Sequence, residues 1–209
     1  MSNILIRSEK TSDFFAVENL VRESFYNVYM PGAFEHYVLH QMRKLPDFLP
    51  ELSLVLEYNE EIIGQIAFLK TNILLDSGKL FPVLTFGPFC IAKKFQKKGF
   101  GKLLLEDALK KATEKNFNAV FIEGDKNFYF RSGFHFAFEY LIRYDGVPPE
   151  TNPEFFLAKE LKPNSLQEIS GIYKTPDVYF SAIHNPKDFE VFDKNFPEKE
   201  KSVQPGQIF

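Results

Sequence analysis

Residues 89–102 read Phe89-Cys90-Ile91-Ala92-Lys93-Lys94-Phe95-Gln96-Lys97-Lys98-Gly99-Phe100-Gly101-Lys102, an apolar strand that passes through a basic, glycine-containing turn into an amphipathic helix. The first four N–H groups of a helix have no intrahelical partner and the helix dipole is positive there, so a diphosphate can accept their hydrogen bonds. Gly99 and Gly101 lack a Cβ and let the backbone approach phosphate oxygens closely. This segment therefore predicts a pyrophosphate-binding turn.

Positive charge gathers at the same turn. Lysines stand at positions 93, 94, 97, 98 and 102, in a chain whose formal net charge is -3. The concentration is therefore local, and it predicts a polyanionic ligand with two or three of these lysines in contact with phosphate.

Two common glycine motifs are excluded by their spacing. A Walker A loop has a glycine where this chain has Gln96, and Ser or Thr where it has Leu103. A dinucleotide fingerprint has its third glycine at the position of Leu104. A nucleotide-binding α/β domain built on either motif is therefore excluded.

The remaining pattern, Gln-x-x-Gly-x-Gly from Gln96 to Gly101, resembles the pyrophosphate-binding motif of the GNAT superfamily of acetyl-CoA-dependent N-acetyltransferases. A second match follows the predicted strand 118–123, where residues 124–134 read as a short helix closed by glycine. Tyr129 stands four residues before the pair Gly133-Phe134, the place of the superfamily's usual general acid. The resemblance covers roughly residues 3–145.

Other residues refine this resemblance. The Gly-Asp opening at 124–125 and the run Phe86-Gly87-Pro88-Phe89 are similar to the YhbS-like branch of predicted acetyltransferases. Lys93 replaces a proline common in the superfamily, and Asp125 stands where an alanine is frequent. At these two positions the sequence departs from the superfamily's pattern, so the resemblance does not define the ligand contacts there.

The resemblance implies an α/β (α+β) fold, with a mixed, mostly antiparallel twisted sheet, a splayed parallel strand pair and flanking helices. Hydrophobic periodicity agrees, since it predicts a strand at 4–6, two helices before residue 46, a hairpin at 52–69, a strand at 81–91, a helix at 99–115 and strands at 119–123, 134–144 and 155–158. Leu103 and Leu104 are expected to face the sheet. We expect one acetyltransferase domain at 1–161 and an irregular, proline-containing extension at 162–209 packed on it.

The function implied is transfer of an acetyl group from acetyl-CoA directly to a primary amine. The alternative is a non-catalytic acyl-CoA-binding sensor or regulatory module. Acetyl-CoA is the expected cosubstrate and no metal is expected. The expected partner is a small-molecule or peptide amine acceptor. Its identity, and whether the natural acyl group is acetyl or longer, stay open.

Site residues follow from the motifs. Tyr129 is the predicted general acid, since a phenol is still protonated at neutral pH. The expected cofactor-binding residues are Phe89, Cys90 and Ile91, through backbone N–H groups of a bulged strand, and Gln96, Lys97, Lys98, Gly99, Phe100, Gly101 and Lys102. Cys90 is read as a small apolar residue and not as a nucleophile. The general base stays open among Glu57, Glu123 and Asp125, each of which also reads as a solvated or structural carboxylate.

The acceptor side is predicted less sharply. The loop between the two first helices covers the acceptor pocket in this superfamily, so its lining is expected from Tyr26, Tyr29, Phe34 and His36. His36 and His40 are spaced like a metal-ligand pair, but no third ligand is recognisable.

Composition bounds the rest. A hydrophobic content of 44% with 25% charged residues is typical of a globular domain, and 25 phenylalanines predict an aromatic core or pocket. One cysteine excludes an intrachain disulfide and fits a reducing compartment. No signal peptide or membrane span is recognised, and the acidic chain gives no general attraction to nucleic acid. We therefore expect a cytoplasmic protein with no membrane or nucleic-acid partner, and leave a homodimer open.

Overall fold

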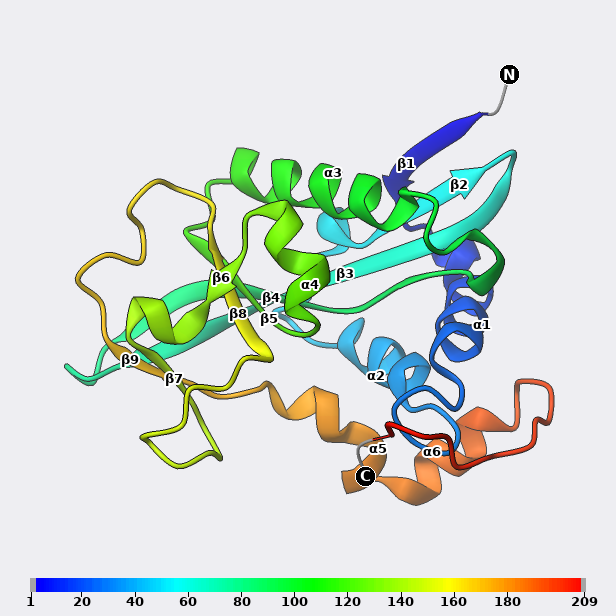
Figure 1. Cartoon of the computed structure of the whole chain (residues 1–209). Coiled ribbons are helices and arrows are strands. Elements are labelled where there is room, and N and C mark those ends of the chain that lie inside the picture. The colour runs from blue at the N-terminus through cyan, green and yellow to red at the C-terminus, as the bar shows by residue number, and fades with distance from the viewer. Residues whose placement is uncertain (1–2, 208–209) are drawn as a thin grey trace. The chain divides into compact units, whose positions relative to one another are not determined.

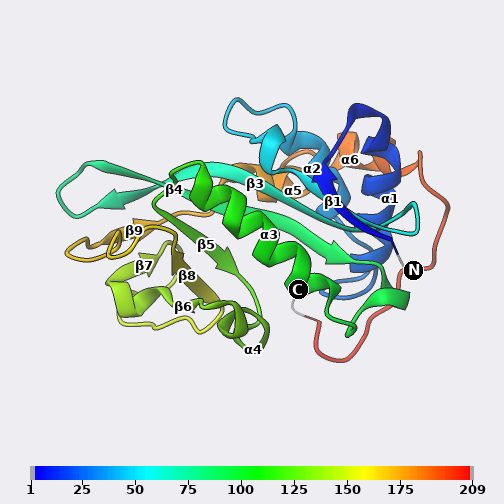
Figure 2. The same cartoon turned by 90° about the horizontal axis from the view of Figure 1, so that it is seen from above.

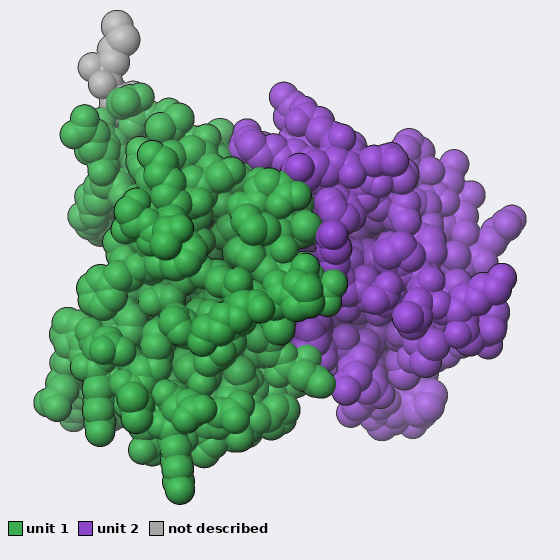
Figure 3. Space-filling model, turned by 180° about the vertical axis from the view of Figure 1, so that it is seen from behind, with its two compact units in different colours: residues 1–67, 88–104, 177–209 green, residues 68–87, 105–176 purple. Residues whose placement is uncertain are grey.

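The computed structural model describes residues 3–207, which form two compact units (Figure 3). Within the described residues, unit 1 comprises residues 3–67, 88–104 and 177–207, and unit 2 comprises residues 68–87 and 105–176. Three long elements, which Figure 1 labels, contribute residues to both units: strands β3 (Glu61–Leu75) and β4 (Leu80–Ile91) and helix α3 (Phe100–Glu114).

Unit 1 combines a small antiparallel sheet with helices. Its strands are β1 (Ile4–Ser8), β2 (Leu54–Tyr58) and the first part of β3, and its helices are α1 (Phe14–Phe25), α2 (Glu35–Met42), α5 (Ser181–His184), α6 (Pro186–Asp193) and the start of α3. β1 pairs with β2 from Ile4↔Tyr58 to Ser8↔Leu54, and β2 pairs with β3 through a bulge at Leu56/Glu57. Three-residue 3-10 turns precede α1, β2 and α3.

Unit 2 contains the parallel pairing. Its elements are β5 (Ala119–Glu123), α4 (Lys126–Tyr129), β6 (His135–Phe136), β7 (Ile142–Tyr144), β8 (Phe156–Glu160) and β9 (Gly171–Tyr173), with parts of β3, β4 and α3 (Figure 2). β4 and β5 are parallel at Leu84↔Val120 and Thr85↔Phe121, and β7 and β9 are parallel too. β5 pairs antiparallel with β8, which also pairs with β6, and β9 joins β3. The predicted mixed, mostly antiparallel α/β fold is confirmed, while the splay of β4 and β5 stays a prediction.

The strand–helix–strand unit forms as its hydrophobic pattern predicts. β5 has the predicted bounds, and α3 starts within one residue of the predicted helix. Its inner face is shifted, however, because Leu104 and Leu105 are fully buried whereas Leu103 is 41% exposed. Leu103 therefore does not face the sheet as predicted.

The segment 134–144 is not one strand. It forms β6, a 3-10 turn at Ala137–Tyr140 and β7, with Leu141 at φ 58° between the last two. This left-handed conformation cannot occur inside an extended strand, and it lets Ile142 pair with Gly171.

The C-terminal region is more regular than predicted. Residues 162–209 contain β9, a 3-10 turn, α5 and α6. Pro186 does not break α6 but begins it, a position where the missing N–H costs nothing. Residues 177–207 belong to unit 1 and residues 162–176 to unit 2, and the boundary at residue 161 stays a prediction.

Candidate active site

The basic turn of unit 1 is held by its own side chain and by two left-handed residues. Gln96 donates from Nε2 to the Ile91 carbonyl at 2.9 Å, which ties the turn to the end of β4. Lys97 has φ 60° and Gly99 has φ 90°. A Cβ at Gly99 would meet no atom within 4 Å, so the space above this backbone is open. An open, glycine-lined helix entry fits a diphosphate.

Lysines surround the start of α3, where the helix dipole is also positive and therefore disfavours positive charge. Leu103 N donates to Gly99 O, so the N–H groups of Phe100 and Gly101 precede the first intrahelical bond. No acidic residue occurs in this first turn, and the neighbouring lysines are exposed. Each cation near a helix N-terminus destabilises the helix by about 0.3–1 kcal/mol. An anionic ligand would offset this cost.

The individual lysines differ in their contacts. Lys94 forms a surface ion pair with Glu61 at 2.7 Å, and Lys98 donates to the Lys94 carbonyl. Both ammonium groups lie over the Phe95 ring. Lys93 Nζ lies 3.4 Å from the Tyr26 carbonyl, so the loop after α1 lies beside this turn. Surface pairs of this kind are worth little and leave the side chains able to rearrange.

The strand that leads to the turn is buried. Cys90 and Ile91 are each 7% exposed, and Ala92 N donates to the Ile63 carbonyl. Burial raises the pKa of Cys90 to about 12, so its thiol stays protonated at neutral pH, which agrees with its reading as an apolar residue. The predicted role of the Phe89, Cys90 and Ile91 backbone N–H groups stays a prediction.

Tyr129 lies in unit 2 inside an aromatic cluster. Its ring contacts those of Phe86, Phe128 and Phe134, with centroids 5.9, 5.0 and 5.3 Å away, and the residue is 8% exposed. A Cβ at Gly124 would come within 2.4 Å of the ring, so glycine at the end of β5 is what lets the ring sit there. Caps at both ends fix the short helical segment that contains Tyr129. The Asp125 side chain accepts from Asn127 N at the start of α4, and Gly133 ends the following turn at φ 77°.

The three candidate bases have different surroundings. Glu57 accepts two hydrogen bonds from Arg7 and is committed to that ion pair. Asp125 is occupied by helix capping. Glu123 is exposed and accepts a 2.6 Å hydrogen bond from Thr175, whose hydroxyl also lies 2.7 Å from Tyr144 Oη. Burial raises the pKa of Tyr144 to about 12.

The predicted acceptor residues are mostly covered by the C-terminal segment of unit 1. Tyr26 is 5% exposed and donates from its hydroxyl to the Lys199 carbonyl. Phe34 packs edge-to-face on Phe189. Only Tyr29 among the four is largely exposed, at 50%. Acceptor contacts by Tyr26 and Phe34 stay predictions that this packing does not support.

His36 has a structural environment instead. Its side chain has no exposed area, and Nε2 lies 2.9 Å from Asp193 of α6. Arg22, which is 2% exposed, donates to the same carboxylate at 2.7 Å and to the Pro197 carbonyl. Burial lowers the pKa of His36, which favours the neutral ring. His36 therefore joins α2 to α6, a contact that no local sequence pattern predicts, and its predicted place in the acceptor pocket stays a prediction.

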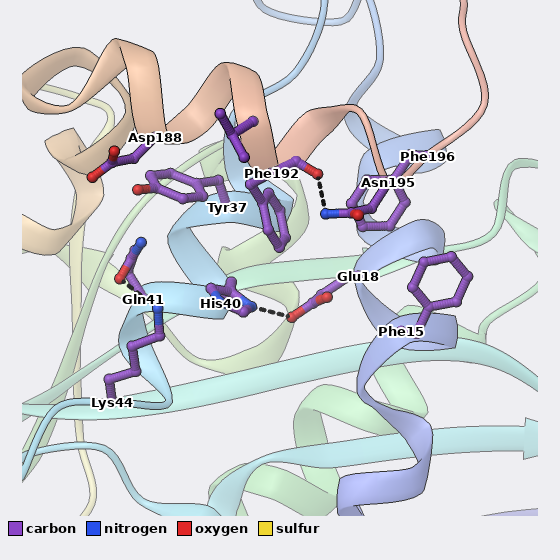
Figure 4. Close-up of a pocket in the computed structure, with 11 residues that line it drawn as sticks. Phe15, Glu18, Tyr37, His40, Gln41, Lys44, Asp188, Phe192, Asn195 and Phe196 are labelled. Carbon is purple, nitrogen blue, oxygen red and sulfur yellow. Dashed lines mark hydrogen bonds and ion pairs between the residues drawn. The ribbon is translucent and has the colours of Figure 1, made fainter.

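A groove on unit 1 lies between α1, α2 and α6 (Figure 4). His40 points across it to Glu18 at 3.0 Å, and Glu18 also accepts from Arg43. His36 and His40 thus bond to different carboxylates, and no group of three or more His, Cys, Asp or Glu side chains within residues 3–207 could hold a metal ion. In the same described range, no helix has the length and apolarity needed to cross a membrane.

A tail-to-loop contact was also missed from the sequence. Asn27, at φ 59°, donates to the Glu200 carbonyl and to Ser202 Oγ, and its amide oxygen accepts from Gly32 N and Ser202 N. The loop after α1 is therefore fastened to residues near the C-terminus. No sequence pattern near Asn27 predicts hydrogen bonds to Glu200 and Ser202.

Comparisons with known proteins agree with the fold. The structure of the GNAT family N-acetyltransferase YhbS from Escherichia coli in complex with CoA is 24% identical, with a TM-score of 0.73, and the match covers 86% of this chain and 93% of that one. A GNAT family acetyltransferase from Brucella melitensis in complex with acetyl-CoA is 20% identical, with a TM-score of 0.66, and the match covers 85% of this chain and 98% of that one. No protein of curated function matches the chain in sequence.

The family itself is shown by sequence. The model of the acetyltransferase (GNAT) family matches residues 16–134, more than half of the chain, and this range includes both the basic turn and Tyr129. The predicted likeness to the YhbS branch is confirmed at the level of the fold. The chain belongs to the acetyltransferase (GNAT) family.

Proposed function

We propose that this protein is an N-acetyltransferase that takes the acetyl group of acetyl-CoA and transfers it directly to a primary amine. The observation that carries the proposal is the start of α3, where an open glycine backbone and exposed lysines meet a helix end without acidic residues. A diphosphate satisfies both the N–H groups and the charge of this turn. Membership of the family and the CoA and acetyl-CoA complexes of the two neighbours agree with this ligand.

The residues of unit 1 would bind the cosubstrate. Phe100 and Gly101 would donate backbone N–H groups to the diphosphate, and the neighbouring lysines, Lys97 among them, would add charge. Gln96 would keep the turn in register with the end of β4 through its bond to Ile91. When bound, acetyl-CoA supplies an acetyl thioester, and backbone donors of β4 would polarise its carbonyl.

Tyr129 would supply the proton for the departing thiolate. Its ring is fixed by three aromatic neighbours and by the close approach of Gly124, so its hydroxyl has little freedom. General acid catalysis of this kind contributes about 10²- to 10⁴-fold. A cytoplasmic location and one acetyltransferase domain ending near residue 161 remain parts of this proposal.

Two measurements test the proposal. Isothermal titration calorimetry should show binding of acetyl-CoA, and a steady-state assay should detect free CoA release in the presence of primary amines such as tyramine and a lysine peptide. Absence of acetyl-CoA binding would exclude the proposed function. Binding without turnover over a broad amine panel would favour the non-catalytic acyl-CoA-binding module.

A further inference from the structure

Glu35, the first residue of α2, is a partly buried carboxylate with no cationic partner among residues 3–207. The other enclosed carboxylates of unit 1 are ion-paired: Glu9 and Glu18 with Arg43, Asp13 and Glu57 with Arg7, and Asp193 with Arg22. Oε2 of Glu35 accepts a 2.9 Å hydrogen bond from Phe34 N, and no cation completes its surroundings. Burying an unpaired carboxylate destabilises a fold, so such a group is a candidate for function.

A second polar group of unit 1 also lacks a partner. Ser24, near the end of α1, is 7% exposed, and its hydroxyl makes no well-formed hydrogen bond among the described residues. It lies close enough to the Cys90 thiol to lower the pKa of that thiol, and Glu35 is close enough to raise it. Ser24 and Glu35 therefore both lie near Cys90, which stands in β4 shortly before the basic turn.

We propose that Glu35 receives the ammonium group of the acceptor and takes its proton, with Ser24 Oγ as a second polar contact for the same group. The inference rests on the proposed function and names the residue that would bind and deprotonate its primary amine, which is cationic in solution at neutral pH. The ring of Tyr29, which is 50% exposed, belongs to the same α1–α2 region and suits the apolar part of such an amine.

Burial raises the pKa of Glu35, which makes the carboxylate a better proton acceptor at neutral pH. Phe34 N–H and the start of α2 stabilise the anion enough to keep it available. Other titratable groups on the elements packed against α2 are Glu18, Arg22, Glu23, Cys90, Asp177, Tyr179, His184, Lys187, Asp188, Glu190 and Asp193. Glu18, Arg22 and Asp193 are engaged in ion pairs, and the Cys90 thiol stays protonated.

The reaction balances with these groups. The ammonium nitrogen gives one proton to Glu35, and its lone pair then forms a bond to the thioester carbonyl carbon. The C–S bond breaks, its electron pair leaves on sulfur, and the sulfur takes a proton to become a thiol. The new amide nitrogen loses one proton, and Glu35 returns its own proton to solvent.

The test is Glu35→Gln, which keeps the size and an oxygen that can accept from Phe34 N–H. Acetyl-CoA affinity should stay within about twofold, while kcat/KM for an amine such as tyramine should fall by about 100-fold at pH 7. The deficit should shrink above the pKa of the amine, because the solution then supplies neutral amine. A residue that only packs the helix start would not produce this pH-dependent recovery. Glu57→Gln and Glu123→Gln, measured in parallel, show whether another candidate base is used instead.

A second measurement does not depend on turnover. The side-chain carboxyl carbon resonance of Glu35, followed by NMR, should shift on addition of methylamine, tyramine or a lysine amide, and should not shift with 4-ethylphenol, which lacks the amine. Undiminished turnover in Glu35→Gln, or no amine-dependent shift across this panel, overturns the inference. Absence of acetyl-CoA binding in the parental protein would instead exclude the proposed function, so the two failures are distinguishable.

Discussion

Unit 1 and unit 2 bury different kinds of side chain. Unit 1 encloses ion pairs, such as Arg22 with Asp193 and Arg43 with Glu18, between its helices and strands. Unit 2 has an apolar core in which the rings of Phe121, Phe156 and Tyr173 stack. Buried charge needs matched partners, whereas apolar rings need only volume and shape. Unpaired polar groups such as Glu35 are therefore conspicuous in unit 1, and the predicted acid of unit 2, Tyr129, sits among aromatic rings.

The largest effect is expected at the proposed phosphate cradle of unit 1, which consists of the basic turn at residues 93–99 and the start of α3. Gly99→Asp adds a Cβ at φ 90° and a negative charge at the proposed diphosphate position. Acetyl-CoA affinity should fall by at least about 1,000-fold, equivalent to about 4.1 kcal/mol, as measured by isothermal titration calorimetry. Charge repulsion and the strained backbone act in the same direction.

Unit 2 offers a matched control. Gly78, in the turn between β3 and β4, has φ 79°, and like Gly99 it has no atom within 4 Å of the position that a Cβ would take. Gly78→Asp therefore imposes the same backbone strain away from the cradle and should leave acetyl-CoA affinity unchanged. Equal losses in both variants would mean that strain alone explains the effect, and the cradle assignment would then be withdrawn.

The next effect concerns stability. Asp193→Ala removes the carboxylate that His36 and Arg22 share, and leaves the guanidinium buried. Breaking such a pair costs about 3 kcal/mol. A urea titration should show this loss of unfolding free energy, whereas Asp188→Ala on the same helix, which lines the open groove, should change it by less than about 0.5 kcal/mol. If Asp193→Ala also changes the free energy of unfolding by less than about 0.5 kcal/mol, the contacts of Asp193 with His36 and Arg22 contribute nothing to stability.

Acid should weaken the same contacts between Asp193, His36 and Arg22. Burial alone would raise the pKa of Asp193, but hydrogen bonds from His36 and Arg22 outweigh it and lower the pKa below the ordinary 3.8. A lowered pKa in the folded state means that the carboxylate stabilises the fold above pH 3.8 and loses this contribution as the pH falls further. The pKa of His36 is also lowered, by burial, so its neutral form adds a loss of stability that begins below about pH 6.5.

The contrast between the units also explains what the sequence could predict. The basic turn, α3 and β5 follow from local signals, namely glycine spacing and hydrophobic periodicity, and they form as predicted. Arg22 and Asp193 are 171 residues apart, and no local pattern links them, so the burial of His36 could not be foreseen. For the same reason the sequence does not predict that Glu35 lacks a cationic partner. An acidic residue at a helix start is usually explained by its favourable interaction with the helix dipole.

The prediction for unit 2 is a loss of rate without a loss of binding. Tyr129→Phe keeps the ring that packs on Phe86 and Phe134 and removes one hydroxyl. If this hydroxyl protonates the thiolate, kcat should fall by about 100-fold, equivalent to about 2.7 kcal/mol, with acetyl-CoA affinity unchanged. Pre-steady-state measurements should confirm that chemistry limits the rate. Parental turnover in a folded Tyr129→Phe variant would show that another group protonates the departing thiolate.

The smallest effect separates charge from shape within unit 1. If lysines at the turn contact phosphate, acetyl-CoA affinity should weaken by about fivefold between low and high salt, since screening reduces exposed charge interactions. Lys97→Gln should reduce this salt dependence, because Lys97 is exposed beside the helix start. Lys44→Gln is the control, since Lys44 lines the groove between α1, α2 and α6 and not the basic turn. An affinity that does not change with salt, in a protein that still loses binding in Gly99→Asp, would assign the recognition to the α3 backbone and leave the lysines as solvated surface residues.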